Sequence, residues 1–134
     1  MEVREVALET VLKIRREVMY PEESIDFVKL EEDIIGLHLG LYVNNKLVSV
    51  TSVFEKNGAV QFRKFATLIE EQGKGYGTAL LQYIFDWAIA EGKRSIWCNA
   101  RISATALYRK FGMELTGKPW QKYGIEFIKM EKQF

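Results

Sequence analysis

The sequence has little of several features that would narrow its class. Cys98 is the only cysteine, so no disulfide can form within the chain. Lys and Arg number 19 and Asp and Glu 18, and a net charge of +1 gives no overall field that would attract nucleic acid or an anionic membrane. The first residues lack the basic-then-apolar pattern of a signal peptide, and no apolar run reaches the ~20 residues of a membrane-spanning helix. We therefore expect a cytoplasmic protein with no metal site, no nucleic-acid partner and no membrane contact.

What the chain does have is enough apolar residues for one core. It has 134 residues, of which 48% are hydrophobic, and we therefore expect a single domain over residues 1–134. A short strand is expected at residues 2–7, and an apolar stripe predicts a helix from Leu8 to Met19 that Pro21 ends. Ser24 to Leu30 fits either a short helix or an irregular cap.

Three strands follow, because apolar residues alternate between Gly36 and Leu68. Asn44-Asn45 and Asn57-Gly58 interrupt this alternation, and such pairs favour the positive φ angles of tight hairpin turns. The three strands are therefore predicted to form an antiparallel meander.

In the second half of the chain, helices and strands alternate. A wide apolar face from Leu80 to Ile89 predicts a long helix that Gly92 ends. Ser95 to Asn99 is then expected to be a strand parallel to the one before the helix, since a helical crossover joins them. The other expected elements are a helix from Ser103, as its N-cap, to Lys110, with Gly112 as its stop, and closing strands at 113–115 and 125–130. This order is α+β rather than doubly wound.

Three glycines at alternate positions, Gly73, Gly75 and Gly77, lie between the meander and the long helix. Glycine allows positive φ and a close approach of backbone N–H groups to a bulky ligand. The first turn of the helix adds unpaired N–H donors and a partial positive charge, and Lys74 adds a mobile cation. This combination predicts a cradle for a phosphate or pyrophosphate, the alternative being an ordinary flexible connection.

Two well-known phosphate loops do not fit this spacing. A dinucleotide-binding fingerprint needs a glycine at the sixth position, which is Thr78, and a Walker A loop needs Gly-Lys-Ser/Thr, which is absent. Gln72-x-x-Gly75-x-Gly77 instead resembles motif A of the GCN5-related N-acetyltransferases (GNAT). In that family the motif binds the pyrophosphate of acetyl-coenzyme A (acetyl-CoA).

A second stretch resembles another GNAT signature. The residues that match it in register are Ala104, Leu107, Tyr108, Lys110 and Gly112. Arg101 stands where that family has Asn, and Met113 stands where Phe is usual. The two signatures occur in the order of the family and cover the chain from Gln61 onward.

The resemblance implies the acyl-CoA N-acyltransferase fold, with a mixed, mostly antiparallel central sheet of about six to seven strands, flanking helices and a β-α-β cofactor-binding unit. It implies an acetyl-CoA-dependent N-acetyltransferase, an acyltransferase that moves the acetyl group to a primary amine of a small molecule or peptide by direct attack. The alternative is a non-catalytic sensor that binds coenzyme A or a nucleotide. The implied cofactor-binding residues are Phe65, Ala66, Thr67, Gln72, Gly73, Lys74, Gly75, Tyr76, Gly77, Thr78 and Lys110.

The resemblance also implies roles in the chemistry. A backbone N–H from residues 65–67 would polarise the thioester carbonyl, and Tyr108 would give a proton to the departing thiolate. A phenol with a pKa of about 10 suits that leaving group. Cys98 is a weaker candidate, as an acyl-carrying nucleophile, since the chain has no second His to activate it. The general base stays open among Glu55, Glu70, Glu71, His38 and water, although a lone histidine in a strand more often packs or lies at the surface.

Other polar residues have less specific patterns. Arg15 and Arg16 are expected on a solvated helix face, the alternative being contact with an acidic substrate or the cofactor phosphates. Gln61, Arg63 and Thr67 are expected to share one face of their strand, toward the substrate cleft.

The last expectation concerns assembly. The closing segment, residues 125–134, is short and carries Lys129, Glu131 and Lys132, so we expect it at a protected sheet edge or between subunits. With three Trp and eight Phe in a small chain, a homodimer is favoured over a monomer.

Overall fold

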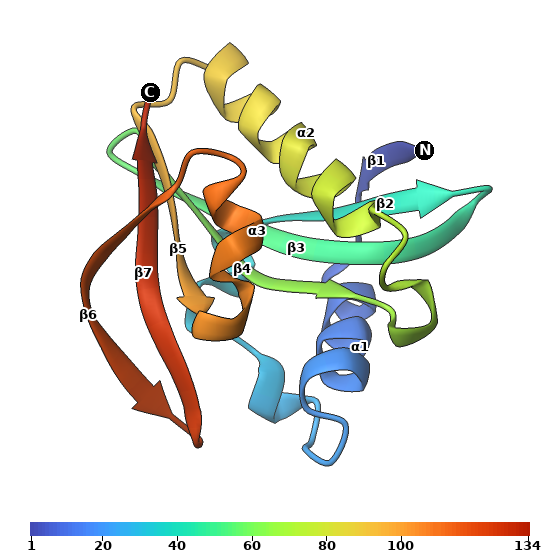
Figure 1. Cartoon of the computed structure of the whole chain (residues 1–134). Coiled ribbons are helices and arrows are strands. Elements are labelled where there is room, and N and C mark those ends of the chain that lie inside the picture. The colour runs from blue at the N-terminus through green and yellow to red at the C-terminus, as the bar shows by residue number, and fades with distance from the viewer. The chain divides into compact units, whose positions relative to one another are not determined.

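The computed structural model describes residues 1–134 and contains one mixed sheet and three α-helices (Figure 1). Seven strands lie in the order β1-β2-β3-β4-β5-β7-β6, so the predicted α+β fold with a mixed, mostly antiparallel sheet is confirmed. The chain forms two compact units, Met1–Phe54 with Phe62–Ile84, and Glu55–Gln61 with Phe85–Phe134. The expectation of a single domain over residues 1–134 stays a prediction.

The elements follow the predicted order. The strands are β1 (Glu2–Glu5), β2 (Leu37–Val43), β3 (Lys46–Lys56), β4 (Ala59–Thr67), β5 (Ser95–Arg101), β6 (Glu114–Lys122) and β7 (Ile125–Gln133). The α-helices are α1 (Leu8–Met19), α2 (Tyr76–Ala90) and α3 (Thr105–Arg109). The 3₁₀ turns are η1 (Asp26–Val28), η2 (Glu31–Ile35), η3 (Ile69–Glu71) and η4 (Ile102–Ala104).

In the first unit, helix α1 packs its apolar stripe onto the sheet. Val11 of α1, Val50 of β3 and Ala66 of β4 are buried together with Val6 in one cluster. Burial of each valine side chain contributes about 1.5–3 kcal/mol to the free energy of unfolding. This packing fixes the helix against the strand that leads into the glycine loop.

Both predicted hairpin turns are confirmed. Asn44 and Asn45 have φ angles of 50° and 66°, and Asn57 and Gly58 have φ angles of 54° and 80°. Two successive positive φ angles match the right-handed twist of the flanking strands. The β2–β3 hairpin therefore has a fixed register, in which Leu39 lies opposite Thr51.

Strand β4 contains a local irregularity at Lys64, whose φ of 56° lies in the left-handed region. An extra residue of this kind, as in a β-bulge, breaks the alternation of faces along a strand. Arg63 pairs with Glu32 of η2, whereas Thr67 hydrogen-bonds to Ser49 of β3. The expectation that Gln61, Arg63 and Thr67 share one face is therefore wrong.

In the second unit, β5 runs parallel to β4 and antiparallel to β7. Three residue pairs join β4 to β5, from Ala59↔Ser95 to Gln61↔Trp97, which confirms the predicted crossover. Strand β7 lies between β5 and β6, so the expectation that residues 125–134 form a sheet edge is wrong. The position of β7 depends on its pairing with β5, which is distant in the sequence. The edge strand is β6.

Helix α3 starts later than predicted. Its N-cap is Ala104, which makes no capping hydrogen bond, and Ser103 lies in the preceding turn η4. Thr105 Oγ1 donates instead to the carbonyl of Ile102 at 3.0 Å. The prediction of Ser103 as the N-cap is therefore wrong, whereas Gly112, with a φ of 85°, ends the turn as expected.

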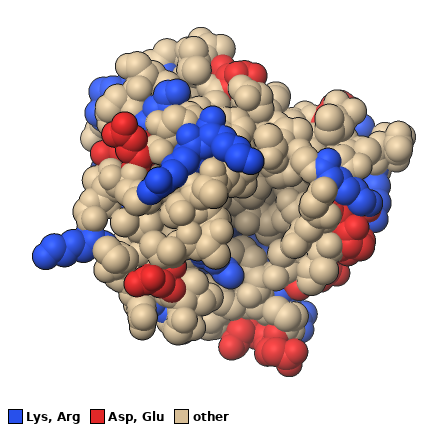
Figure 2. All heavy atoms as spheres, in the orientation of Figure 1, with Lys and Arg blue, Asp and Glu red and all other residues tan.

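The surface carries both signs of charge. Figure 2 shows basic and acidic side chains interspersed over the face drawn, in keeping with the net charge of +1. None of the helices combines the length and the apolar character that crossing a bilayer would require.

Candidate functional site

The glycine loop has the backbone geometry of an anion cradle. Gly73 and Gly75 have φ angles of 79° and 83°, a conformation in which any other residue would be strained. A Cβ at either position would meet no atom within 4 Å, so the space above the loop is open. The two glycines thus leave the backbone accessible to a bulky ligand.

The amides of this loop have no protein acceptor. Helix α2 starts at Tyr76, and the first hydrogen bond of its N-terminal turn runs from Ala79 N to Gly75 O at 3.0 Å. The backbone N–H groups from Gly73 to Thr78 donate to no carbonyl or side chain of the chain. Unpaired donors at the start of a long helix, on exposed backbone, suit an anionic ligand such as a pyrophosphate.

Side chains brace the loop against β4. Gln72 Nε2 donates to the carbonyl of Thr67 at 3.0 Å. Ser49 Oγ donates to the carbonyl of Ala66 at 3.2 Å, so Thr67 Oγ1 donates to Ser49 Oγ at 2.8 Å. A Cβ on Gly77 would lie 3.3 Å from the ring of Phe65, so glycine lets the first turn of α2 approach β4 closely. Gln72, predicted as a ligand contact, has its side chain engaged in this bracing.

The cation of the loop is not free. Lys74 Nζ and Lys46 Nζ each lie 3.2 Å from a different oxygen of Glu71. Hydrogen bonds from Lys46 and then from Lys74 hold the pKa of the Glu71 carboxyl below its usual range. Glu71 is therefore a poor proton acceptor, and Lys74 reaches a phosphate only by leaving this carboxylate.

Phe65, Ala66 and Thr67 lie beyond the last residue pair of the β4–β5 ladder, which ends at Gln61↔Trp97. Leu68 N, at the end of this segment, donates to Val48 O of β3 at 2.9 Å. Residues 65–67 therefore lie on a strand that is held on its β3 side and leads directly into the cradle.

The phenol of Tyr108 is buried in the second unit, on α3. Burial, and then the neighbouring Cys98, raise the pKa of Tyr108, while Arg101 lowers it to a smaller extent. The phenol therefore stays protonated and can act as a hydrogen donor through the neutral range. Lys110 follows α3 directly, with an exposed side chain.

Cys98 is a buried thiol of β5. Burial raises its pKa to about 12, so the thiolate that a nucleophile requires is not formed at neutral pH. This environment fits a packing role rather than an acyl carrier.

Two of the remaining base candidates, His38 and Glu55, are engaged in other contacts, whereas Glu70 is exposed and lies 3.9 Å from Lys46. His38 is buried, and its ring nitrogens contact Ser52 Oγ at 2.7 Å and the carbonyl of Asp33 at 2.9 Å. Since a carbonyl can only accept, Nε2 carries the hydrogen of the contact with Asp33. Glu55, in the second unit, pairs with Lys93 at 3.2 Å. Of the two structural alternatives expected for His38, packing or a place at the surface, the structure shows packing.

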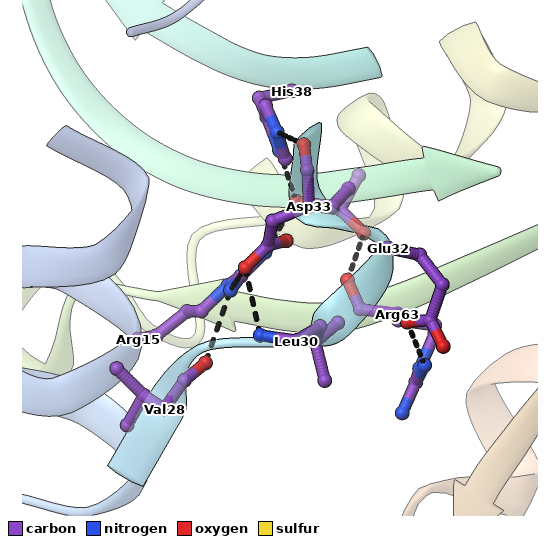
Figure 3. A network of polar contacts seen from close by, with 9 residues as sticks. Arg15, Val28, Leu30, Glu32, Asp33, His38 and Arg63 are labelled. Carbon is purple, nitrogen blue, oxygen red and sulfur yellow. Dashed lines mark hydrogen bonds and ion pairs between the residues drawn. The ribbon is translucent and has the colours of Figure 1, made fainter. Parts of the chain in front are cut away.

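A buried ionic network that the sequence did not predict holds η2 against α1 and the sheet (Figure 3). Arg15 is fully buried, and its two terminal nitrogens donate to the two carboxylate oxygens of Asp33, each at 2.8 Å. Arg15 also donates to Val28 O at 3.0 Å and to Ser52 Oγ at 2.8 Å. Both readings of Arg15, a solvated residue or a ligand contact, are therefore wrong, because α1 turns it inward. Arg16 remains at the surface.

The carboxylate of Asp33 has a third donor, Leu30 N, at 2.8 Å. Burial alone would raise the pKa of Asp33, but the hydrogen bonds from Arg15 and Leu30 outweigh this and hold it below the ordinary value. One feature of the sequence does indicate that Arg15 is buried, because it lies in the apolar stripe of Val11, Leu12, Val18 and Met19.

The position of Glu32 follows from this network, because Glu32 directly precedes the anchored Asp33 in η2. Its carboxylate accepts a hydrogen bond from Arg63 Nη1 of β4 at 3.0 Å (Figure 3). Both side chains are partly exposed, at 48% for Glu32 and 31% for Arg63. This pair brings a carboxylate and a guanidinium to the strand that carries residues 65–67.

Comparisons with known proteins agree on one family. Residues 15–134 match the acetyltransferase (GNAT) domain family. An uncharacterized N-acetyltransferase of Bacillus subtilis, YitI, is 28% identical over 93% of this chain and 90% of its own length. The chain therefore belongs to the GNAT acetyltransferase family, and the prediction of an acetyl-CoA-dependent acyltransferase is confirmed.

Solved structures show the same fold. The ribosomal-protein-S18-alanine N-acetyltransferase from Escherichia coli has a TM-score of 0.81 at 18% identity, covering 98% of this chain and 92% of that chain. An acetyltransferase from Bacillus subtilis, solved in complex with CoA, has a TM-score of 0.76 at 17% identity, covering 99% and 97% of the two chains. The predicted acyl-CoA N-acyltransferase fold is thereby confirmed.

Proposed function

We propose that this GNAT acetyltransferase binds acetyl-CoA at the glycine loop, residues 73–78, and transfers the acetyl group to a primary amine by direct attack. The observation that carries the proposal is the row of backbone amides without protein acceptors at the start of α2. These donors would bind the pyrophosphate, and the open space above Gly73 and Gly75 would admit it. A structure of the same fold has been solved with CoA bound, which supports this choice of ligand.

Individual side chains and one backbone segment also have proposed roles in binding. Lys74 would exchange Glu71 for a phosphate oxygen, and Gln72 would hold the loop in shape through its bond to Thr67. Lys110, exposed after α3, would add a second cation for the ligand. A backbone N–H from residues 65–67 would polarise the thioester carbonyl as negative charge develops on its oxygen.

Tyr108 is proposed to donate a hydrogen bond and then a proton to the thiolate as it leaves. Its buried phenol remains protonated at neutral pH, which is the state that this role requires. The acceptor must reach the carbonyl as a free amine, so a base or water has to remove one proton first. Because Glu71 and His38 are held by other contacts, we propose that this base is another group or water.

Calorimetry with acetyl-CoA tests the cradle. We expect one molecule bound per chain, and strong weakening in Gly75→Glu, whose carboxylate would meet the pyrophosphate. Gly124→Glu is a matched control, because Gly124 also has a positive φ, 73°, with open space around its Cβ position, but lies in the β6–β7 turn. No detectable binding of acetyl-, succinyl- or free coenzyme A would refute the proposal.

Turnover separates an enzyme from a sensor. Release of free thiol from acetyl-CoA, measured with a panel of polyamines, amino sugars, amino acids and peptides, should depend on the amine. A protein that only senses coenzyme A would bind the ligand and release no thiol above the rate without protein.

We also propose that the chain acts as a single catalytic domain and assembles as a homodimer. Light scattering at micromolar concentration measures the mass directly. A mass near 15.5 kDa at all concentrations would reject the dimer.

A further inference from the structure

We propose that Glu32 and Arg63 form the acceptor subsite, and that the acceptor is an amine with a carboxylate close to its reactive amino group, as in an amino acid. Glu32 would bind the ammonium and Arg63 the carboxylate. This inference deepens the proposed function and rests on it, since the acetyl group must be delivered beside β4.

The contact between the two side chains can be opened at little cost. It consists of one hydrogen bond of 3.0 Å between partly exposed groups, and ion pairs of this kind contribute little to stability. Arg63 uses one of its five N–H donors in this bond, and a guanidinium can bind a carboxylate through two parallel hydrogen bonds. A zwitterionic ligand would replace each partner by one of the same charge, so neither charge would be left alone.

The carboxylate of Glu32 is held on a rigid support. The neighbouring Asp33 is buried and receives three hydrogen bonds of 2.8 Å, two from Arg15 and one from Leu30. The carbonyl of Asp33 accepts a further bond from His38 at 2.9 Å (Figure 3). A recognition group on such an anchored segment is held in place before the ligand arrives. The buried network would thus act as a positioning device for Glu32.

Arg63 lies on the strand of the proposed reaction. It is two to four residues from residues 65–67, which at about 3.3 Å per residue is roughly 7–13 Å along the strand. Thr51 Oγ1 donates to the carbonyl of Arg63 at 3.1 Å, so the backbone there is fixed by β3. The long Arg63 side chain would cover much of this distance, so an acceptor whose carboxylate it binds would bring the adjacent amino group toward the thioester carbonyl.

This subsite would serve acetyl transfer to the amino group of the bound acceptor. The ammonium loses one proton to Glu32 or to a water beside it, and the amine nitrogen then bonds to the acetyl carbon. The C–S bond breaks, and the second nitrogen proton ends on the thiolate. The products are the N-acetylated acceptor, free coenzyme A and one proton.

Matched acceptors test the inference in the full-length enzyme. Amino acids are compared with the amines that lack only the carboxylate, such as phenylalanine with phenethylamine and lysine with cadaverine, by thiol release at fixed acetyl-CoA. We expect the carboxylate-bearing member to have a kcat/KM at least ~10-fold higher. Arg63→Gln should lower kcat/KM for that member by ~10- to 100-fold and leave its partner nearly unchanged, and Arg63→Lys should recover part of the loss.

Glu32→Gln should lower kcat/KM for both members of each pair. Glu31→Gln is the control, because Glu31 is an exposed acid of the same turn η2, and it should match the wild type. Thermal unfolding and acetyl-CoA calorimetry verify that each variant is folded and binds the cofactor.

Three results would overturn the inference. These are equal or better turnover of the amines without a carboxylate, an Arg63→Gln variant that keeps the preference, and no turnover of any carboxylate-bearing amine. If calorimetry still shows acetyl-CoA binding in these cases, the cofactor proposal stands and only the acceptor subsite is wrong. Loss of acetyl-CoA binding in the wild type would refute both.

Discussion

Removing the Asp33 carboxylate should strongly destabilise the protein. Asp33 is 5% exposed and accepts three hydrogen bonds of 2.8 Å, two of them from the fully buried Arg15. Asp33→Ala would leave that guanidinium without a counter-charge, and breaking a buried pair on one side costs about 3–5 kcal/mol. A domain of this kind unfolds with a free energy of about 5–15 kcal/mol in total, so the loss is a large share.

Urea unfolding, followed by tryptophan fluorescence, measures this effect. With an m-value of about 1.5 kcal/mol/M, the midpoint should fall by roughly 2–3 M. Asp26→Ala is the control, because Asp26 is exposed and pairs only with Lys29 of the same segment. The double variant Arg15→Met/Asp33→Leu should recover much of the loss, since no buried charge remains. If the midpoint of Asp33→Ala falls no further than that of Asp26→Ala, the reasoning about the buried network is wrong.

Three further predictions concern titration and chemistry. The pKa of Asp33 is lowered in the folded protein, so its stabilising effect is complete above the unfolded pKa of about 3.9 and is lost as the pH falls through the folded pKa. The difference in unfolding free energy between wild type and Asp33→Ala should therefore shrink only in acid. Tyr108→Phe should keep its affinity for coenzyme A by calorimetry and lose ~10²-fold in kcat, whereas equal turnover would leave Tyr108 a packing role. Because burial raises the pKa of Cys98 to about 12, its thiol should resist iodoacetamide at pH 8 in the folded protein and react in urea. Cys98→Ala should retain turnover, and a Cys98→Ala variant that folds but is inactive would support the acyl-carrier hypothesis.

Local chemistry explains what could be predicted from the sequence. The paired Asn44-Asn45 and the Asn57-Gly58 dipeptide have turn preferences that depend on the residues themselves, and both adopt positive φ angles. The bounds of α1 follow from its apolar period and from Pro21 close behind it. The glycine loop could be predicted because glycine permits a positive φ and because a helix N-terminus has unpaired N–H donors, and both features favour anion binding.

What could not be predicted depends on contacts between distant residues. Lys64 has no preference for positive φ, so nothing in its neighbourhood indicated the irregularity that sends Arg63 and Thr67 to different partners. Arg15 can be buried because Asp33, which is 18 residues away, supplies a counter-charge. The place of β7 inside the sheet likewise depends on its pairing with β5.

The proposed function depends above all on binding of the acetyl-CoA pyrophosphate by the amides of residues 73–78. Amide ¹H–¹⁵N spectra of the isotope-labelled protein, recorded during titration with coenzyme A, test it most directly. We expect the largest shifts at Gly73, Gly75 and Gly77, with the signals of the turn glycines Gly58 and Gly124 nearly unmoved. Saturable binding that leaves the amides of the loop unshifted would contradict it.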